Sequence, residues 1–470
     1  MIFNTPIFFW FFCIFILFYG FVFLKQTPRL YLILVGSLVF YGAWNYLFIP
    51  LLVASGIADY FIAQAIYKAK DQLRKKRWLG LSLLINLGLL GIFKYADFVL
   101  ISVADLLSTL GYQASITTLS WVLPVGISFY TFQSLSYTID IYRGDLKPRK
   151  GLVEFVAALS FFPQLVAGPI LRAKHILPQM HSITLPEWAS IKHGFLLITI
   201  GLVKKTGADL LAAPVQTAFD AQGPVSTLEL WTGVLAFAGQ IYGDFSGYTD
   251  MAIGIALLLG FRIPLNFRLP YFALSPVDFW RRWHISLSTW LRDYLYISLG
   301  GNRNNKRARN VFITMLLGGL WHGAAWTFVA WGAFHGIIIT LTHYLSSLSF
   351  LDRFSRSSSW FIKFTKWLIT FYLVLIGWVF FRANDIASAC DILIQLHSLN
   401  SNIISGTYAN TILVLTAVWM LLVHAFDYLV IYKSDKLEAK AWLFWPIVTF
   451  AQACCLFIGE PSSEFIYFQF

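Results

Sequence analysis

The sequence predicts an all-α protein that crosses a membrane many times and forms a single domain over residues 1–470. Three observations lead to this fold class: 58% of the 470 residues are hydrophobic, only 12% are charged, and long apolar segments recur from end to end. An ordinary soluble domain is about 45–50% apolar and about 25% charged. The chain therefore has too little polar material to cover a water-exposed surface of its size.

The apolar segments define the expected helices. A bilayer core of about 30 Å requires roughly 20 residues of helix. The two longest segments exceed this length, so each is expected to hold two spans or a broken helix, and the whole chain roughly ten to thirteen membrane or re-entrant helices. The segments are Ile7–Leu24, Leu30–Trp44, Leu47–Tyr67, Trp78–Phe93, Phe98–Leu110, Leu152–Ile170, Gly194–Val215, Leu228–Phe261, Val311–Leu345, Trp360–Phe381, Thr411–Ile431 and Ala441–Ile458.

The net charge of +12 is distributed as in a membrane protein. Basic residues gather in short runs between apolar segments, and such runs are typical of cytoplasmic loops. Lys25 and Arg29 follow the first segment and the run 68–77 comes two segments later, which predicts an outside N-terminus. No signal-peptide pattern is present, so we interpret the first segment as a retained span. Without a recognised motif or a soluble basic face, nucleic-acid binding is disfavoured.

Two regions, about 124–172 and 240–336, mix Gly, Pro, Arg, Asp and His into otherwise apolar sequence. Irregular backbone at membrane depth has to be buried in protein or line a wet cavity, because lipid cannot satisfy its hydrogen bonds. Both regions are therefore expected inside the protein. The four cysteines lack the spacing of a zinc site or a disulfide framework, so no metal site is expected.

His322 is the first catalytic candidate. It lies in the stretch 318–326 (GGLWHGAAW), whose small residues let neighbouring helices approach closely. An imidazole is costly in lipid and exchanges protons near neutral pH, as acyl transfer to a hydroxyl or thiol requires. The residues alone leave two interpretations open: a catalytic histidine, or a structural histidine that is hydrogen-bonded across helices.

The stretch 278–286 (DFWRRWHIS) supplies a second candidate, His284, directly after Arg281, Arg282 and a tryptophan. Arginine and tryptophan commonly anchor a helix at the membrane interface. The two arginines could equally bind the phosphates of a donor. Both interpretations of this stretch stay open.

Two further histidines follow. His335 comes 13 residues after His322, which at about 100° per residue predicts that the two face different sides of one helix and share no metal ion. We interpret His335 as structural and place His343 near a membrane boundary.

The stretch 242–250 (YGDFSGYTD) places two carboxylates, Asp244 and Asp250, in an apolar segment. Buried carboxylates need partners, and we expect them among the arginines after residue 280. A structural polar network is the favoured interpretation, with Asp244 as its functional candidate. Since no G-x-S-x-G elbow, P-loop or G-x-G-x-x-G stretch occurs, histidine is the expected catalytic agent.

Together these stretches resemble the membrane-bound O-acyltransferase family, and within it the bacterial branch of AlgI-like alginate and PatA-like peptidoglycan O-acetylation proteins. The resemblance runs from end to end of the chain in the family's order, which makes it highly specific. The matching stretches are 123–133 (LPVGISFYTFQ), 162–170 (FPQLVAGPI), 243–248 (GDFSGY), 279–286 (FWRRWHIS), 320–323 (LWHG), 380–383 (FFRA) and 465–470 (FIYFQF).

The resemblance implies a ring of tilted helices around a central funnel. N-terminal peripheral helices would occupy 1–110, a catalytic core 120–345, and C-terminal helices 355–470. It implies that His322 and His284 are catalytic. Supporting or donor-binding roles fall to Arg281, Arg282, Asp244, Trp321 and Tyr248.

The same resemblance implies a cytoplasmic thioester donor, acetyl-coenzyme A, no bound cofactor, and a location in the bacterial inner membrane. The acetyl group would pass through the core to an extracytoplasmic partner and finally to a polysaccharide. That partner would be an SGNH-type or AlgJ-, AlgX- or PatB-like acetyltransferase.

Two other functions stay open on the sequence. A D-alanyl transferase of the teichoic-acid type would share both histidines but take its donor from a carrier protein. A transporter would also explain buried Asp, Arg and His. The transporter hypothesis further predicts paired internal repeats, which the sequence does not contain.

Overall fold

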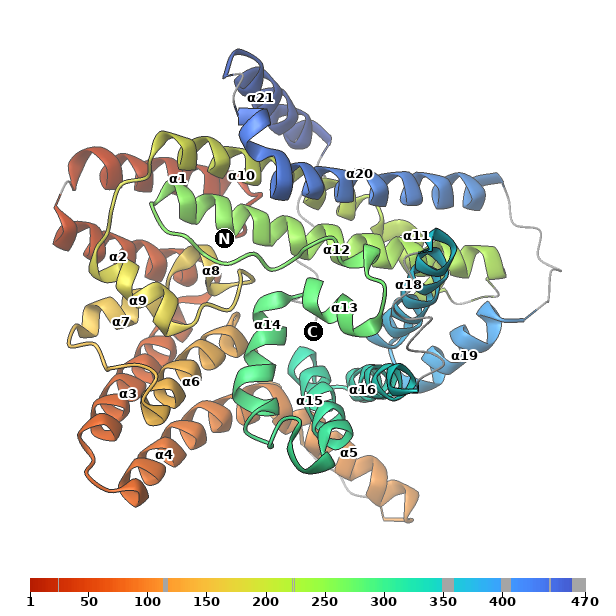
Figure 1. Cartoon of the computed structure of the whole chain (residues 1–470), viewed down its shortest axis with the longest axis horizontal. Coiled ribbons are helices and arrows are strands. Elements are labelled where there is room, and N and C mark those ends of the chain that lie inside the picture. Colours follow the sequence, from red (N-terminus) through yellow and green to blue (C-terminus); the bar gives the residue numbers. More distant parts are fainter. Residues whose placement is uncertain are drawn as a thin grey trace. The chain divides into compact units, whose positions relative to one another are not determined.

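The computed structural model describes residues 1–470 except 24, 113–116, 222, 224, 349–358, 399–406, 439–440 and 459–470 (Figure 1). The regular structure of the described residues is helical throughout, without a β-strand, which confirms the predicted all-α class. The chain divides into two compact units: one holds Met1–Gly194 with Ala252–Pro264, the other Phe195–Met251 with Leu265–Phe470. The motif at 465–470 lies outside the described residues.

The first unit contains nine complete helices among its described residues. They are α1 (Pro6–Leu17), α2 (Gln26–Asn45), α3 (Ile49–Lys68), α4 (Gln72–Leu90), α5 (Ala96–Thr109), α6 (Ile127–Arg143), α7 (Leu152–Leu159), α8 (Phe162–Leu165) and α9 (Ala173–His181). Local sequence explains several helix starts. Thr5 caps α1 ahead of Pro6, and the Asp71 carboxylate accepts the Arg74 N–H at the start of α4.

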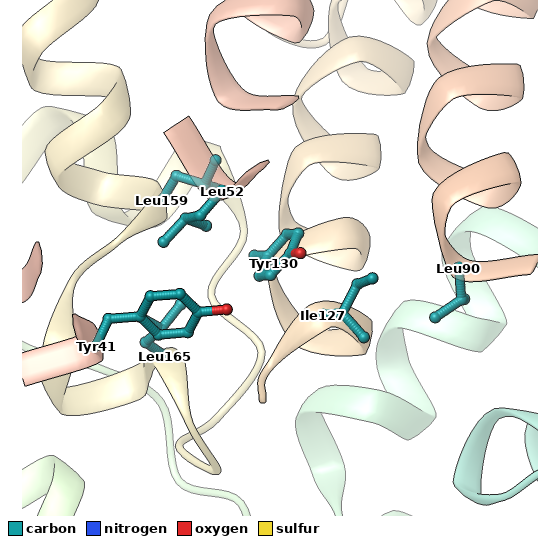
Figure 2. Close-up of a cluster of buried hydrophobic side chains, with 7 residues drawn as sticks. All are labelled: Tyr41, Leu52, Leu90, Ile127, Tyr130, Leu159 and Leu165. Carbon is teal, nitrogen blue, oxygen red and sulfur yellow. The ribbon is translucent and has the colours of Figure 1, made fainter. Parts of the chain in front are cut away.

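A cluster of buried apolar side chains joins α2, α3, α4, α6, α7 and α8 in this unit (Figure 2). Two stretches that carry the family resemblance meet beside it. Gly126 has φ +76° and approaches the Leu165 backbone so closely that a Cβ atom would lie 2.4 Å from its carbonyl oxygen. Only glycine fits this position, because it combines a left-handed backbone with a close approach. Gln164 Nε2 also donates to Gln133 Oε1 at 2.7 Å. The stretches at 123–133 and 162–170 therefore pack directly against each other.

A buried carboxylate ties three helices of the first unit together. Asp59 on α3 is fully buried and accepts hydrogen bonds from Ser82 Oγ at 2.6 Å, Asn86 Nδ2 at 2.6 Å and Ser134 Oγ at 2.5 Å. These donors come from α4 and α6. Donors on both carboxylate oxygens make the burial of this polar group tolerable at membrane depth.

The second unit contains the C-terminal helices and the greater part of two long ones. Its helices are α10 (Trp188–Asp209), α11 (Ala212–Phe219), α12 (Thr227–Leu258), α13 (Pro276–Arg282), α14 (Ile285–Trp290), α15 (Arg307–His322), α16 (Trp326–Ser347), α18 (Trp360–Arg382), α19 (Ile386–Leu396), α20 (Thr407–Glu438) and α21 (Ala441–Ile458). The chain passes between the two units within α10 and again within α12.

Five helical segments of the described residues are long and apolar enough to cross a membrane. The first two each contain a pair of helices, and shorter apolar helices accompany the five. The segments are Gln26–Lys68, Gln72–Thr109, Trp326–Ser347, Trp360–Arg382 and Ala409–Tyr432. The chain is thus a multi-pass membrane protein. The larger number of ten to thirteen helices and their arrangement as a ring stay predictions.

The two longest apolar segments differ in structure. The segment 311–345 is broken into α15 and α16 at Gly323 and Ala325, whose backbones are extended. The segment 228–261 is instead occupied by the single 32-residue helix α12. The difference follows from composition, because an extended Gly-Ala-Ala turn ends α15, whereas the glycines of α12 keep helical geometry and pack against neighbouring helices.

Candidate active site

His322 lies at the last position of α15, where α15 packs closely against α16. Glycines make this approach possible. A Cβ atom on Gly319 would lie 2.2 Å from the carbonyl oxygen of Phe328, and one on Gly332 would lie 2.5 Å from that of Met315. Backbone-to-backbone contact of this kind fixes the register of the two helices. The small residues predicted to allow helix approach therefore also fix the position of the histidine.

Aromatic side chains surround the His322 imidazole, which is 4% exposed. Its ring centroid lies 5.0 Å from that of Trp321, 5.0 Å from Trp331 and 5.3 Å from Phe381. Phe381 belongs to the stretch 380–383 that carries the family resemblance. These rings lower the local polarity around the imidazole, so electrostatic interactions there are stronger than in bulk water.

His284 lies between α13 and α14 in a left-handed backbone conformation, with φ +44°. Such a backbone is strained for a residue other than glycine, and strain of this kind often occurs at functional sites. The ring is fully buried, and its centroid lies 6.4 Å from that of His322. The two predicted catalytic histidines therefore lie in one site, with Trp321 in contact with both.

Asn266 defines the protonation of His284. Its Oδ1 atom accepts from the backbone N–H of Ser286 at 3.1 Å and from the Ser286 hydroxyl at 2.8 Å, and it lies 3.2 Å from His284 Nδ1. An amide oxygen only accepts, so Nδ1 carries the hydrogen. Burial lowers the pKa of His284 to about 3, which keeps the ring neutral. Its Nε2 is consequently a bare acceptor, and it has no hydrogen-bond partner among the described residues.

A cavity of about 600 Å³ opens beside His322. Helices α13 to α16 supply its walls, and the volume is in the range of small-molecule sites. The polar lining is basic: Arg281, Arg292, Arg307 and His343 contribute to it, and the described lining residues include no Asp or Glu. Such a cavity favours an anionic ligand.

The arginines on and beside this cavity are not equivalent. Arg282 forms an ion pair with Asp278 at 2.9 Å and Arg292 one with Asp293 at 2.6 Å. Arg307 donates to the His343 ring at 2.9 Å. Arg281 is exposed and forms no ion pair or hydrogen bond with any described residue. Of the pair at 281 and 282, Arg281 is thus the cation available to a ligand.

A second cavity of about 1030 Å³ adjoins the first and shares part of its lining. The shared residues are Asn302, Arg307, Val311 and His343. Arg309 adds a further guanidinium to the second cavity, and its described lining also lacks a carboxylate. The two cavities thus adjoin at these shared residues, and together they are called the basic recess.

The prediction that His322 and His335 lie on one helix is wrong. The two histidines lie on different helices, because the chain breaks at residues 323–325. As a result both rings contact the same indole: Trp331 lies 5.0 Å from His322 and 4.8 Å from His335. His335 Nδ1 accepts a hydrogen bond from Trp280 Nε1 at 3.2 Å. This bond is consistent with a structural role for His335.

The expected partners of the carboxylates on α12 are also wrong. Asp244 pairs with Lys205 at 2.8 Å and Asp250 with Lys204 at 2.6 Å, and both lysines come from α10 instead of the arginines after residue 280. The pairing is possible because Gly201 and Gly247 let α10 and α12 cross in backbone contact. Tyr248 is buried on α12 one turn after Asp244. The two carboxylates belong to an ion-pair network with these lysines, and neither they nor Tyr248 line either cavity.

Sequence reasoning missed several polar residues. Asp427 on α20 pairs with Lys204 and accepts from the Tyr242 hydroxyl. The two adjacent lysines in the apolar segment 194–215 were a usable signal, since buried cations require acidic partners. Asn266 had no such signal, because its role depends on a loop that returns to the turn before α14.

Comparisons with known proteins identify the family. A sequence model of the MBOAT, membrane-bound O-acyltransferase family matches residues 147–390, slightly more than half of the chain. The chain belongs to the membrane-bound O-acyltransferase family. Both histidines, the basic cavity and the broken helix segment lie within the matched residues.

Relatives of this O-acyltransferase have related names. The protein named "Probable alginate O-acetylase AlgI" of Pseudomonas aeruginosa is 43% identical over 83% of this chain and 73% of its own. The protein of the same name from Pseudomonas putida is 38% identical over 100% of both chains. The "Peptidoglycan O-acetyltransferase" of Helicobacter pylori is 37% identical over 85% of this chain and 80% of its own. The similarity thus extends well beyond the matched family region.

Proposed function

We propose that this O-acyltransferase takes an acetyl group from acetyl-coenzyme A in the cytoplasm and passes it through a bacterial inner membrane for O-acetylation of an extracytoplasmic polysaccharide. The observation that carries the proposal is the position of His322 on a basic cavity free of described carboxylates, with a second neutral histidine beside it. The relatives are named for O-acetylation of alginate and of peptidoglycan, which supports an acetyl group as the transferred group and a glycan as its acceptor.

The shape and charge of the recess support a long, phosphate-bearing donor. Along α15, the rise from Arg307 to His322 is about 22 Å at 1.5 Å per residue. Basic residues cluster at the start of this helix, at Arg303, Lys306 and Arg307, as expected for a cytoplasmic end. Phosphates held there would leave a flexible thioester arm to reach the histidines.

In the proposed mechanism His322 acts as general base. It accepts the proton of the acceptor hydroxyl, whose oxygen attacks the thioester carbonyl carbon, and it returns the proton to the leaving thiolate. The bare Nε2 of His284 accepts a hydrogen bond from the acceptor or the donor and so orients it. The final acceptor would be reached through an extracytoplasmic SGNH-type partner, similar to AlgJ, AlgX or PatB.

The test uses purified protein in lipid vesicles with acetyl-coenzyme A labelled in the acetyl group. We expect release of coenzyme A from the wild type and a loss of at least about 10²-fold in His322→Ala, as for removal of a general base. His181→Ala is the matched control, because His181 is a surface residue that pairs with Glu154. Normal turnover in His322→Ala would overturn the mechanism. Turnover with a D-alanyl carrier and none with acetyl-coenzyme A would favour the D-alanyl transferase instead.

A further inference from the structure

The indole N–H of Trp331 is buried and has no hydrogen-bond partner among the described residues. The side chain is 1% exposed, lines the cavity beside His322, and lies 5.0 Å from the His322 ring between centroids. An unpaired buried donor is unfavourable, because it has lost its hydrogen bonds to water without gaining others. A donor left unpaired next to a catalytic base indicates that its acceptor arrives with the ligand.

The other indole on this lining and its hydroxyl groups are already engaged as donors. The indole of Trp280 donates to His335, and each hydroxyl donates to an acceptor within the protein. Among the tryptophans and hydroxyl side chains of the described lining, Trp331 is thus the residue whose donor is unused. The engaged hydroxyls are those of Ser288, Thr289, Tyr296 and Thr314.

The surroundings hold the Trp331 indole in one position. Its ring packs against His335 at 4.8 Å, Phe381 at 5.3 Å and Trp280 at 5.5 Å between centroids. Gly332, the next residue, is in backbone contact with α15, so the position of the indole relative to His322 is fixed by the helix crossing. A donor that needs no reorganisation during the reaction is the kind that stabilises a developing charge most effectively.

We propose that Trp331 is a catalytic hydrogen-bond donor that stabilises the oxyanion of the tetrahedral intermediate. This inference rests on the proposed acyl transfer. When the acceptor oxygen bonds to the thioester carbon, the electron pair of the C=O bond moves to the carbonyl oxygen, which the Trp331 N–H then holds. The C=O bond re-forms as the C–S bond breaks, and His322 gives its proton to the thiolate.

The test compares Trp331→Phe with the wild type. Phenylalanine keeps an aromatic ring and removes the N–H group, so we expect kcat to fall about 10²–10³-fold with KM little changed. Trp378→Phe is the matched control, since Trp378 is equally buried, lies in the same aromatic cluster, donates to Tyr271 and does not line the cavity. The control should retain the kcat of the wild type.

A second donor separates catalysis from a packing defect. In dithioacetyl-coenzyme A the carbonyl oxygen is replaced by sulfur, a weak acceptor, so the ratio of wild-type to Trp331→Phe kcat should shrink towards one. An equal ratio for both donors, or a Trp331→Phe enzyme as fast as the active wild type, would overturn the role of Trp331 and leave the acyltransferase proposal intact. A folded wild type that turns over no acyl thioester would overturn both proposals.

Discussion

At the scale of single residues, adjacent side chains of the same type have different roles because of their neighbours. Arg281 and Arg282 are consecutive, yet Asp278 holds only Arg282. The sequence could place both arginines near a donor but could not distinguish their roles. The difference depends on which face of α13 points to the cavity, because that face presents Arg281 while Arg282 pairs with Asp278.

Replacement of Arg281 by Gln is expected to weaken donor binding. A charged hydrogen bond is worth about 1.5 kcal/mol or more, so KM for acetyl-coenzyme A should rise about tenfold. Acetyl-pantetheine, which lacks the phosphates, should show no such change, and Arg282→Gln is the matched control with KM unaltered. Steady-state kinetics with both donors provides the measurement. Equal effects of the two substitutions would contradict the assignment of Arg281.

The buried neutral state of His284 predicts a pH dependence of stability. The pKa is lowered from 6.5 in the unfolded chain to about 3 in the folded protein, so between these values the unfolded state binds the additional proton. The stabilisation is complete above about pH 6.5 and is lost as the pH falls towards 3. Thermal unfolding in detergent should show a steeper loss between pH 6.5 and 4 in the wild type than in His284→Gln. His181→Gln, which alters a surface histidine, should follow the wild type; a His284→Gln curve parallel to the wild type would refute the prediction.

At the scale of helices, the glycine contacts between α15 and α16 determine where His322 lies. A Cβ atom on Gly319 would meet the backbone of Phe328, which cannot move as a flexible side chain could. Gly319→Ala should therefore cost about 1–3 kcal/mol of stability and lower turnover, because the helices have to separate.

Gly88→Ala provides the matched control, since no atom of a described residue lies within 4 Å of a Cβ atom there. This exchange in α4 should be neutral or stabilising by up to about 1 kcal/mol, as alanine favours a helix over glycine. Denaturant unfolding and coenzyme A release measure both effects. A Gly319→Ala protein with wild-type stability would show that α15 and α16 are not in backbone contact at Gly319.

The predictability of the helices depended on composition. Apolar runs such as 360–381 were predictable because the bilayer imposes both length and composition on a span. The break at 323–325 was predictable only as one of two options for this long segment, two spans or a broken helix. The position of His335 relative to His322 was not predictable, because an interruption of the helix changes the direction in which the later side chains point. Ion-pair partners on different helices, such as Lys205 and Asp244, depend on where the helices cross. Local sequence patterns do not reveal these crossings.

At the scale of the whole molecule, the family assignment and the general chemistry could be predicted from the ordered motifs. The cavity, the loop that returns Asn266 to the turn before α14, and the unused donor of Trp331 could not. These features arise where residues far apart in the chain converge. The location in the bacterial inner membrane and the glycan acceptor stay proposals.

The ion pair between Lys204 and Asp427 also has a consequence for biosynthesis. The two residues are 223 positions apart, so a ribosome that inserts helices in order delivers α10 with both lysines long before α20 exists. Until α20 arrives, Lys204 relies on Asp250 alone, and Tyr242 lacks the carboxylate that accepts its hydroxyl. A nascent chain that stops early thus leaves Lys204 with one of its two carboxylate partners and the Tyr242 hydroxyl without its acceptor. The last long helix therefore supplies the remaining hydrogen-bond acceptors of this buried network, and a chain that lacks it leaves polar groups at membrane depth without their full set of partners.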